Sequence, residues 1–323
     1  MKVLVTGATG FIGSALVEHL VNVQQCSVVG MVRSIMDSSI NTSVELRRGE
    51  LGSTNKIDID LSDIEVVIHT AGRAHIMNES FSNPIEEFRR VNTFGTLDFA
   101  RLAVDSGVQR FVFLSSIKVN GEMTSPGHCF KPDDVNVPDD PYGLSKYEAE
   151  QGLLGLAKET GMEVVIIRPP LVYGKGVKAN FASMIKWMGI PVPLPFGAIH
   201  NQRSLVALDN LVSFISLCSD RKKSPQAANQ VFLISDGEDL STTQLLNKVG
   251  QTHSLQSFLG VRAWLVPVPV AIMMRFAKLL GKGAMANRLF SSLQVDSSKA
   301  EVLLGWKPVV TIDEQLTKMA KGD

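Results

Sequence analysis

Residues 3–20 read VLVTGATGFIGSALVEHL, and this stretch decides the fold. The apolar run at 3–5 is closed by glycines at positions 7, 10 and 13, and apolar residues with helical spacing follow from position 11. In such a strand–turn–helix the first glycine permits a tight turn, the second lets the backbone approach a pyrophosphate, and the third lets helix and strand pack closely. Free N–H groups at the helix start favour an anion there. The pattern predicts a nucleotide-binding turn formed by Gly7, Gly10, Phe11, Ile12 and Gly13.

Strand-like and helical stretches alternate outward from this turn. Apolar runs recur at 28–32, 44–46, 66–68, 111–114 and 164–167, and helical spacing spans 84–106 and 141–160. Because the runs are continuous, both faces of each strand should be covered. We therefore predict an α/β fold with a doubly wound parallel Rossmann sheet over residues 1–170, to which a segment near 203–235 returns. Residues 171–202 and 236–323 are predicted to form a smaller, helix-rich C-terminal substrate-binding lid.

The composition excludes several classes of protein. Of 323 residues, 45% are apolar and 20% are charged, which excludes a mainly disordered chain. Lys and Arg together number 32, as do Asp and Glu, so no basic surplus indicates a nucleic-acid partner. The three cysteines lie far apart and show no metal-ligand spacing. We expect a cytoplasmic protein with no disulfide framework and no metal.

No stretch reads as a signal peptide or a membrane span. Glycines interrupt the apolar run that follows Lys2, and no cleavage site follows. Phe258–Leu280 is apolar but contains Arg262, Arg275 and Lys278. We predict a buried or partly buried helix in this stretch rather than a transmembrane segment, and a peripheral membrane contact is the disfavoured alternative.

The end of the second strand indicates which cofactor is used. An acidic residue at this place normally binds the adenosine ribose of NAD, but this chain has Val32 followed by Arg33. An arginine can pair with a 2′-phosphate, which favours NADP(H). NAD(H) stays possible if Arg33 is solvated or stacks on adenine.

A tyrosine and a lysine form the candidate catalytic pair. Tyr142 and Lys146 are four residues apart at the start of a predicted helix and therefore share a face. A nearby ammonium group is expected to lower the pKa of a tyrosine. The spacing alone is common, but Ser115 and Ser116 follow a strand directly and would lie at the carboxyl edge of the sheet, where such sheets bind ligands.

Several motifs in the same order give the chain a family resemblance. It resembles the extended short-chain dehydrogenase/reductase family, specifically its nucleotide-sugar epimerases, dehydratases and ketoreductases. The parts closest to bacterial O-antigen (lipopolysaccharide) enzymes acting at C4 of a UDP-N-acetylhexosamine are SSIKVNGE and RPPLVYGKGVKANF. The motifs are TGATGFIG (6–13), VIHTAG (67–72), VNTFGT (91–96), FVFLSS (111–116), YGLSK (142–146), RPPLVYG (168–174) and DSSKA (296–300).

The resemblance implies a role for each matching residue. Tyr142 would be the general acid/base, Lys146 would hold the nicotinamide ribose, and Ser116 would hydrogen-bond the reacting sugar oxygen. It also implies a UDP-sugar substrate and a possible homodimer. Further cofactor contacts would come from Glu50, Leu51, Ala71, Gly72 and Asn92, and substrate contacts from Asn180, Arg203 and Arg288.

Departures from the family pattern narrow the reaction. Sugar-nucleotide dehydratases carry an Asp–Glu pair where this chain has Ile117 and Lys118, so C6 dehydration lacks its proton-transfer groups. Reduction of a UDP-4-keto-N-acetylhexosamine is favoured by Arg33. A UDP-glucose or UDP-N-acetylglucosamine 4-epimerase with tightly bound NAD is the alternative. A non-catalytic NADP-binding regulator is a remote alternative, because such proteins often lack the pair that Tyr142 and Lys146 form here.

Overall fold

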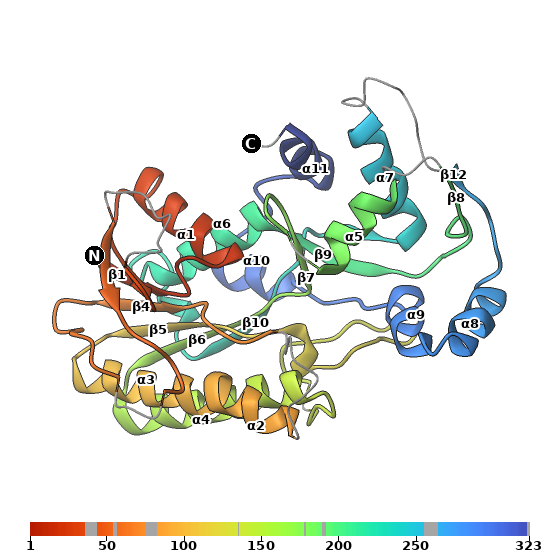
Figure 1. Cartoon of the computed structure of the whole chain (residues 1–323). Coiled ribbons are helices and arrows are strands. Elements are labelled where there is room, and N and C mark those ends of the chain that lie inside the picture. The colour runs from red at the N-terminus through yellow and green to blue at the C-terminus, as the bar shows by residue number, and fades with distance from the viewer. Residues whose placement is uncertain are drawn as a thin grey trace.

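The computed structural model describes residues 1–35, 44–53, 57–74, 83–134, 136–177, 179–188, 192–254 and 264–321. Within these ranges seven parallel strands form one sheet in the order β10-β6-β5-β4-β1-β2-β3 (Figure 1). The predicted α/β fold with a doubly wound parallel sheet is confirmed. The strands are β1 (Lys2–Thr6), β2 (Ser27–Val32), β3 (Glu45–Arg48), β4 (Val66–His69), β5 (Arg110–Leu114), β6 (Glu163–Arg168) and β10 (Gln230–Leu233).

Helices cover both faces of this sheet, as Figure 1 shows. In β1, Val3 and Val5 join the core on one face while Leu4 joins the core on the other. Such two-sided burial explains why the strands read as continuous apolar runs. One face carries α1 (Phe11–Asn22), α6 (Leu208–Ser219) and α10 (Ser298–Leu304); the other carries α2 (Pro84–Phe88), α3 (Gly95–Asp105) and α4 (Pro141–Thr160).

A smaller part with its own core adjoins the main sheet. Its core is built around the stacked rings of Tyr173 and Phe181, 5.4 Å apart. Its strands are β7 (Leu171–Tyr173), β9 (Arg203–Ala207) and β11 (Asp239–Leu240) in one sheet, and β8 (Pro193–Leu194) with β12 (Trp264–Leu265) in another. Its helices are α5 (Ala179–Met188), α7 (Thr242–Ser254), α8 (Val270–Leu279), α9 (Gly283–Phe290) and α11 (Ile312–Lys321), and short helices η2 (Ile117–Val119) and η3 (Pro225–Ala227) lie in connections.

The segment predicted to return to the main sheet divides between the two parts. β10 pairs with β6, as expected. β9 instead pairs with β7 and β11, so the beginning of the 203–235 segment belongs to the smaller sheet. The exact domain boundaries stay a prediction.

The helix predicted over 84–106 has a wide turn in its middle. Between α2 and α3 lies a π-helical segment, η1 (Arg89–Phe94). There the Asn92 side-chain amide donates to Ser145 Oγ at 3.1 Å, and Thr93 Oγ1 donates to the Ser145 carbonyl at 2.9 Å. The wider turn lets two consecutive side chains reach one residue of α4, and such turns are common at functional sites.

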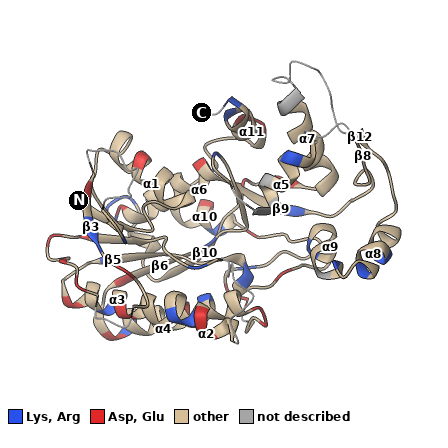
Figure 2. Cartoon of the chain, in the orientation of Figure 1, with Lys and Arg blue, Asp and Glu red and all other residues tan. Residues whose placement is uncertain are grey.

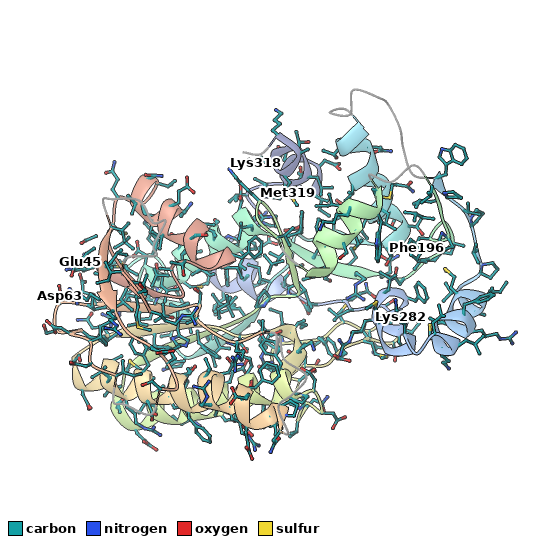
Figure 3. All side chains as sticks on the ribbon, in the orientation of Figure 1. Glu45, Asp63, Phe196, Lys282, Lys318 and Met319 are labelled. Atoms are coloured by element: carbon teal, nitrogen blue, oxygen red, sulfur yellow. The ribbon has the colours of Figure 1, made fainter. Side chains whose placement is uncertain are left out.

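Exposed ion pairs lie at the edge of the sheet where β1 and β3 begin. Lys2 Nζ lies 2.7 Å from Glu45 Oε2 and 2.5 Å from Asp63 Oδ2. Figure 3 labels both acids at this edge, far from the smaller part. These exposed pairs contribute little to stability; they show that the charged groups of this edge are matched in sign.

The helix predicted to be buried or partly buried within the stretch 258–280 is α8, and it is partly buried; residues 258–263 of the stretch lie outside the described residues. In α8 only Met273 is buried, whereas Phe276 and Leu279 are 64% and 83% exposed. Nothing in the described chain packs on the outer face of this helix. Figure 2 shows blue but no red segments on α8 and α9. Among the described residues, no helix is both long enough and apolar enough to span a bilayer.

We predict that Asn210 anchors the C-terminal segment to α6. Its side chain is fully buried and accepts from the backbone N–H groups of Val309 and Val310 at 2.7 and 2.9 Å. Asn210→Ala removes four side-chain hydrogen bonds, to the N–H groups of Val309 and Val310, the Val310 carbonyl and the Asp236 carboxylate, and should lower the free energy of unfolding by about 3 kcal/mol in chemical denaturation. Asn22→Ala, at an exposed position, is the control and should stay within about 0.5 kcal/mol. Equal effects of the two variants would contradict this role.

Candidate active site

The glycine turn between β1 and α1 has no space for larger side chains at positions 7 and 13. Gly7 has φ +67°, and a β-carbon there would lie 2.8 Å from the Ala71 backbone nitrogen. A β-carbon on Gly13 would lie 2.1 Å from the Gly7 carbonyl oxygen. Gly10 caps α1 without a side chain, and the first helical hydrogen bond is from Ser14 N to Gly10 O. The Gly10 N–H donates to the Gly7 carbonyl at 2.8 Å, whereas the N–H groups of 11–13 have no acceptor in the part of the chain that the structure describes, which fits the pyrophosphate of a dinucleotide.

The residues expected around the adenosine lie where β2 and β3 end. Arg33 is exposed directly after β2, and Glu50 is exposed after β3. The Gly49 N–H donates to the Val32 carbonyl at 2.9 Å, so the two strand ends lie side by side. Leu51 differs from the expectation, because it is buried in the core beneath the sheet.

The catalytic candidates come together at the carboxyl edge of β5. Asp140 caps α4 by accepting from Gly143 N at 2.8 Å, and this cap fixes the first helical turn, which carries Tyr142. The Ser116 side chain lies close enough to the Tyr142 hydroxyl to lower the pKa of the tyrosine, against the larger effect of burial. Lys146 is buried, and its ammonium donates to the Leu114 carbonyl at 2.9 Å. The predicted Ser116, Tyr142 and Lys146 therefore lie on the loop directly after β5 and on the first two turns of α4.

Burial dominates the protonation of this group. It raises the pKa of Tyr142 to about 12, against the lowering effect of the Ser116 side chain. Burial also lowers the pKa of Lys146 to about 8, while the charge of Glu150 raises it. The expectation that Lys146 lowers the pKa of Tyr142 is wrong in this structure. The tyrosine is held in its protonated form, which can donate a proton.

Asn92 acts on the backbone around the site. Its amide accepts from Arg73 N at 2.8 Å, donates to Arg73 O at 3.0 Å, and also holds Ser145. A β-carbon on Gly72 would lie 3.2 Å from Lys146 Nζ and 3.3 Å from Asn92 Oδ1, so these three residues meet. Because its side chain is fully buried and used internally, Asn92 positions the 71–73 segment rather than presenting a free amide to a cofactor.

The sequence analysis missed a buried ion pair behind the serines. Glu150 and Arg168 are both buried, with Arg168 Nη2 at 2.6 Å from Glu150 Oε2. Ser115 Oγ donates to the same carboxylate, and Arg168 Nη1 donates to Asn120 Oδ1 at 3.0 Å. The available signal was the spacing: Glu150 follows Lys146 by one helical turn on the face of α4 that meets the sheet.

The proposed diphosphate contacts lie on the smaller part. Arg203 begins β9, and its Nη1 donates to the carbonyls of Arg288 and Ser291 at 2.7 and 3.0 Å. Its remaining N–H groups have no partner in the described chain. The Arg288 side chain pairs with Glu122 at 3.0 Å instead of pointing freely into the site. Asn180 lies in the first turn of α5, and its side chain is outside the described part of the structure.

A chain of charges, also missed, links the catalytic helix to the smaller part. Asp140 pairs with Lys118 at 2.9 Å, Lys118 pairs with Glu122 at 3.2 Å, and Glu122 pairs with Arg288. Lys118 occupies a dehydratase acid position in the family pattern. In this chain the position joins α4 to α9 electrostatically and supplies no acid.

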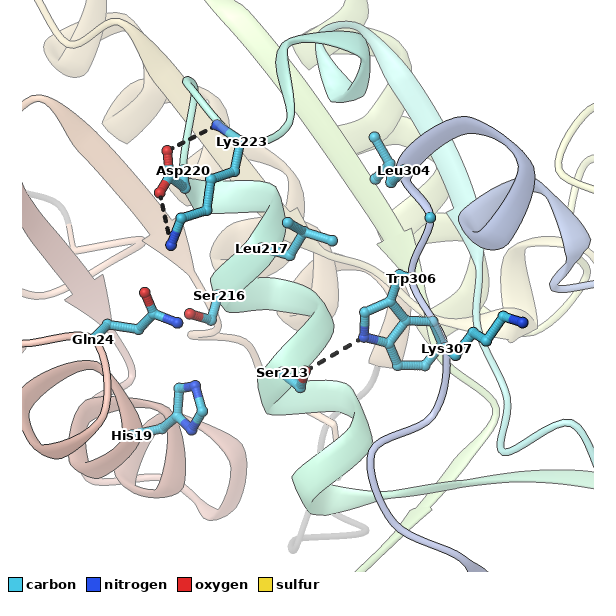
Figure 4. Close-up of a pocket in the computed structure, with 11 residues that line it drawn as sticks. His19, Gln24, Ser213, Ser216, Leu217, Asp220, Lys223, Leu304, Trp306 and Lys307 are labelled. Atoms are coloured by element: carbon cyan, nitrogen blue, oxygen red, sulfur yellow. Dashed lines mark hydrogen bonds and ion pairs between the residues drawn. The ribbon is translucent and has the colours of Figure 1, made fainter.

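A separate cavity of about 400 Å³ lies away from these groups. Figure 4 shows it between α1, α6 and the segment after α10, where Trp306 Nε1 donates to Ser213 Oγ at 3.4 Å. None of the residues predicted from the sequence to bind cofactor or substrate lines it. In the ranges that the structure describes, no three His, Cys, Asp or Glu side chains are placed to hold a metal ion.

Comparisons with known proteins follow the same lines. The model of the NAD dependent epimerase/dehydratase family matches residues 3–233. A UDP-glucose 4-epimerase of Vibrio cholerae is 45% identical over 321 residues, 99% of this chain and 94% of that protein. A dTDP-4-dehydro-6-deoxyglucose reductase of Escherichia coli is 25% identical over 337 residues, 99% of this chain and 96% of that protein. The solved UDP-glucuronic acid 4-epimerase from Bacillus cereus, in complex with UDP-glucuronic acid and NAD, is 24% identical over 99% of both chains, with a TM-score of 0.74.

These comparisons support some of the predictions made from the sequence and leave the preference for NADP unsupported. They agree with the recognised resemblance, with the fold and with an enzyme that acts on nucleotide sugars. The family is described as NAD dependent, and the solved Bacillus cereus enzyme is in complex with NAD. The expected preference for NADP therefore rests on Arg33 alone.

We predict that Tyr142 ionises only at high pH in the cofactor-free protein. Its raised pKa means that the neutral hydroxyl persists from pH 7 to well above pH 10. The ultraviolet titration of the wild type minus that of Tyr142→Phe isolates this group, because the other tyrosines, Tyr147 and Tyr173, are common to both proteins. A difference signal that titrates below its ordinary value of 10.0 would show that Lys146, not burial, controls the tyrosine.

Proposed function

The chain belongs to the NAD dependent epimerase/dehydratase family and is an enzyme of the extended short-chain dehydrogenase/reductase type. On that premise we propose that it reduces the C4 carbonyl of a UDP-linked 4-keto-N-acetylhexosamine. The proposed setting is bacterial polysaccharide synthesis. One observation carries the proposal: the end of β2 has the buried, uncharged Val32 and the exposed Arg33 in place of a ribose-binding acid, which favours an NADPH that exchanges at each turnover. The proton would come from Tyr142, at the start of α4. Reduction of a carbonyl needs a proton donor at that oxygen, whereas oxidation of an alcohol needs a base.

Each residue has a defined task in this proposal. Ser116 orients the sugar O4, and Tyr142 donates its proton to O4 as the carbonyl becomes an alcohol. A reduced nicotinamide, when bound, supplies the hydride to C4. Solvent then reprotonates Tyr142. Lys146, whose ammonium donates to the Leu114 carbonyl, would hold the nicotinamide ribose.

Arg203 is the proposed partner of the UDP diphosphate. Its side chain is half-buried, and its unused N–H groups form a planar fork that suits phosphate oxygens. Asn180 is proposed as a second contact. Arg288 is a weaker candidate, because its side chain already pairs with Glu122.

The proposed cofactor is NADP(H). Val32 is buried and carries no charge, while Arg33 is exposed beside it, so no carboxylate at the end of β2 repels a 2′-phosphate. A second candidate function is 4-epimerisation of a UDP-hexose with tightly bound NAD. The specific observation in its favour is the 45% identity to a protein named as a UDP-glucose 4-epimerase.

The two candidates differ in what the purified protein carries and consumes. A reductase should purify largely free of cofactor and oxidise one NADPH for each UDP-4-keto-N-acetylhexosamine. An epimerase should carry NAD and interconvert UDP-glucose and UDP-galactose, or UDP-N-acetylglucosamine and UDP-N-acetylgalactosamine, with no cofactor added. The second result would overturn the reductase proposal and leave the family assignment intact.

Tyr142→Phe should lower kcat by about 10²–10⁴-fold, because the variant loses the proton donor and keeps the ring. Cofactor affinity and thermal stability should be nearly unchanged. The matched control is Tyr147→Phe on the same helix, which should keep wild-type kcat. A Tyr142→Phe enzyme with more than about half of the wild-type kcat would exclude Tyr142 as the acid.

Arg33→Ala should raise the KM for NADPH by about tenfold to a hundredfold and leave the KM for NADH unchanged. The reason is the loss of one charge-assisted contact to the 2′-phosphate, about 1.5–3 kcal/mol. Arg101→Ala, an exposed arginine on α3, controls for the loss of one positive charge. Equal effects on NADPH and NADH would leave Arg33 without a role in phosphate recognition.

A further inference from the structure

The α8–α9 hairpin lies at the opposite end of the molecule from β1 (Figure 1), and it exposes an apolar surface. In α8, Ile272, Phe276 and Leu279 are 45%, 64% and 83% exposed. Their spacing of four and three residues places them in one line along the helix. Leu280 and Met285 extend the exposed surface at 73% and 61%. We call these five residues the hairpin surface; large apolar side chains grouped on a surface indicate an interaction site.

The charged side chains that the hairpin itself carries are all positive, and of these Arg288 is paired with Glu122. Between Leu240 and Asp296 the sequence has six Lys and Arg residues and no Asp or Glu, although the whole chain has zero net charge. Arg275, Lys278 and Lys282 border the hairpin surface, are exposed, and form no ion pair within the described ranges. Figure 3 labels Lys282 at this end of the molecule. The surface is therefore suited to an apolar partner that carries negative charge.

A second copy of the chain, docked through its own hairpin surface, would not supply the negative charge that this surface requires. A two-fold contact sets the same patch against itself, and here it would bring Arg275, Lys278 and Lys282 against the same cations of the other copy. An anionic bilayer surface offers both complements, since its acyl boundary accepts apolar side chains and its headgroups attract Lys and Arg. We propose that the hairpin surface docks the protein on an anionic lipid membrane, peripherally and reversibly.

The docking surface lies next to the proposed substrate site. Arg203 holds the carbonyls of Arg288 and Ser291 at the end of α9, so one guanidinium connects β9 to the hairpin. Docking would bring the smaller part, rather than the main sheet, to the membrane. This inference concerns attachment alone and holds whichever reaction the enzyme catalyses.

Vesicle flotation of the full-length protein tests the proposal. The wild type should float with phosphatidylcholine vesicles that contain phosphatidylglycerol, should release in high salt, and should not float with pure phosphatidylcholine. The double variants Phe276→Ser/Leu279→Ser and Arg275→Ser/Lys278→Ser should each bind at least about tenfold more weakly. The matched control Val302→Ser/Val309→Ser changes two residues that are 84% and 58% exposed on another surface and should float like the wild type.

Two results would overturn this inference. One is a wild type that stays in solution with anionic vesicles. The other is sedimentation in which the wild type is dimeric and Phe276→Ser/Leu279→Ser is monomeric, because then a second copy covers the surface. Circular dichroism and unchanged turnover of a water-soluble substrate establish that each variant is folded, and these readouts separate a failure of docking from a failure of the proposed reaction.

Discussion

The packing of Gly13 against the carbonyl oxygen of Gly7 is the constraint on which the rest of the molecule depends. A β-carbon at position 13 would lie 2.1 Å from that oxygen, so only glycine lets α1 lie so close to the end of β1. The same turn presses Gly7 against the backbone of Ala71 after β4. The central strands and the first helix thus meet at one point, and the N–H groups of the helix start point to the space between them.

A second set of contacts connects the sheet to α4, the helix that carries Tyr142 and Lys146. Lys146 on α4 donates to the carbonyl of Leu114 at the end of β5, and Ser115, directly after β5, donates to Glu150 on the same helix. The buried Glu150–Arg168 pair ties this helix to β6 as well. Removing one partner of such a buried ion pair is strongly destabilising, because the other charge is then left buried and unpaired. The pair therefore fixes the register of helix and sheet. The position of Tyr142 is thus fixed by the Asp140 cap at the start of α4 and by the buried Lys146 and Glu150 further along the same helix.

The features that depend on local pattern could be predicted from the sequence. Gly7, Gly10 and Gly13 predict the turn because their spacing is a backbone requirement, and Tyr142 with Lys146 follows from helical periodicity. Contacts between distant segments could not be predicted: the Glu150–Arg168 pair depends on how α4 lies on β6, and the Arg203–Arg288 contact spans 85 residues. The exposure of Leu279 could not be predicted either, because an apolar helix has the same sequence pattern whether or not another part of the chain packs on it.

The most direct test of hydride transfer at this site is the fate of a labelled hydride. With NADPH that carries deuterium at the transferred position of the nicotinamide and a UDP-4-keto-N-acetylhexosamine, mass spectrometry and NMR locate the label in the product. We expect one deuterium on C4 of the hexose and none from solvent at that carbon. Product that forms without deuterium at C4, or with C4 hydrogen drawn from water, would contradict hydride delivery at the site built by Ser116, Tyr142 and Lys146.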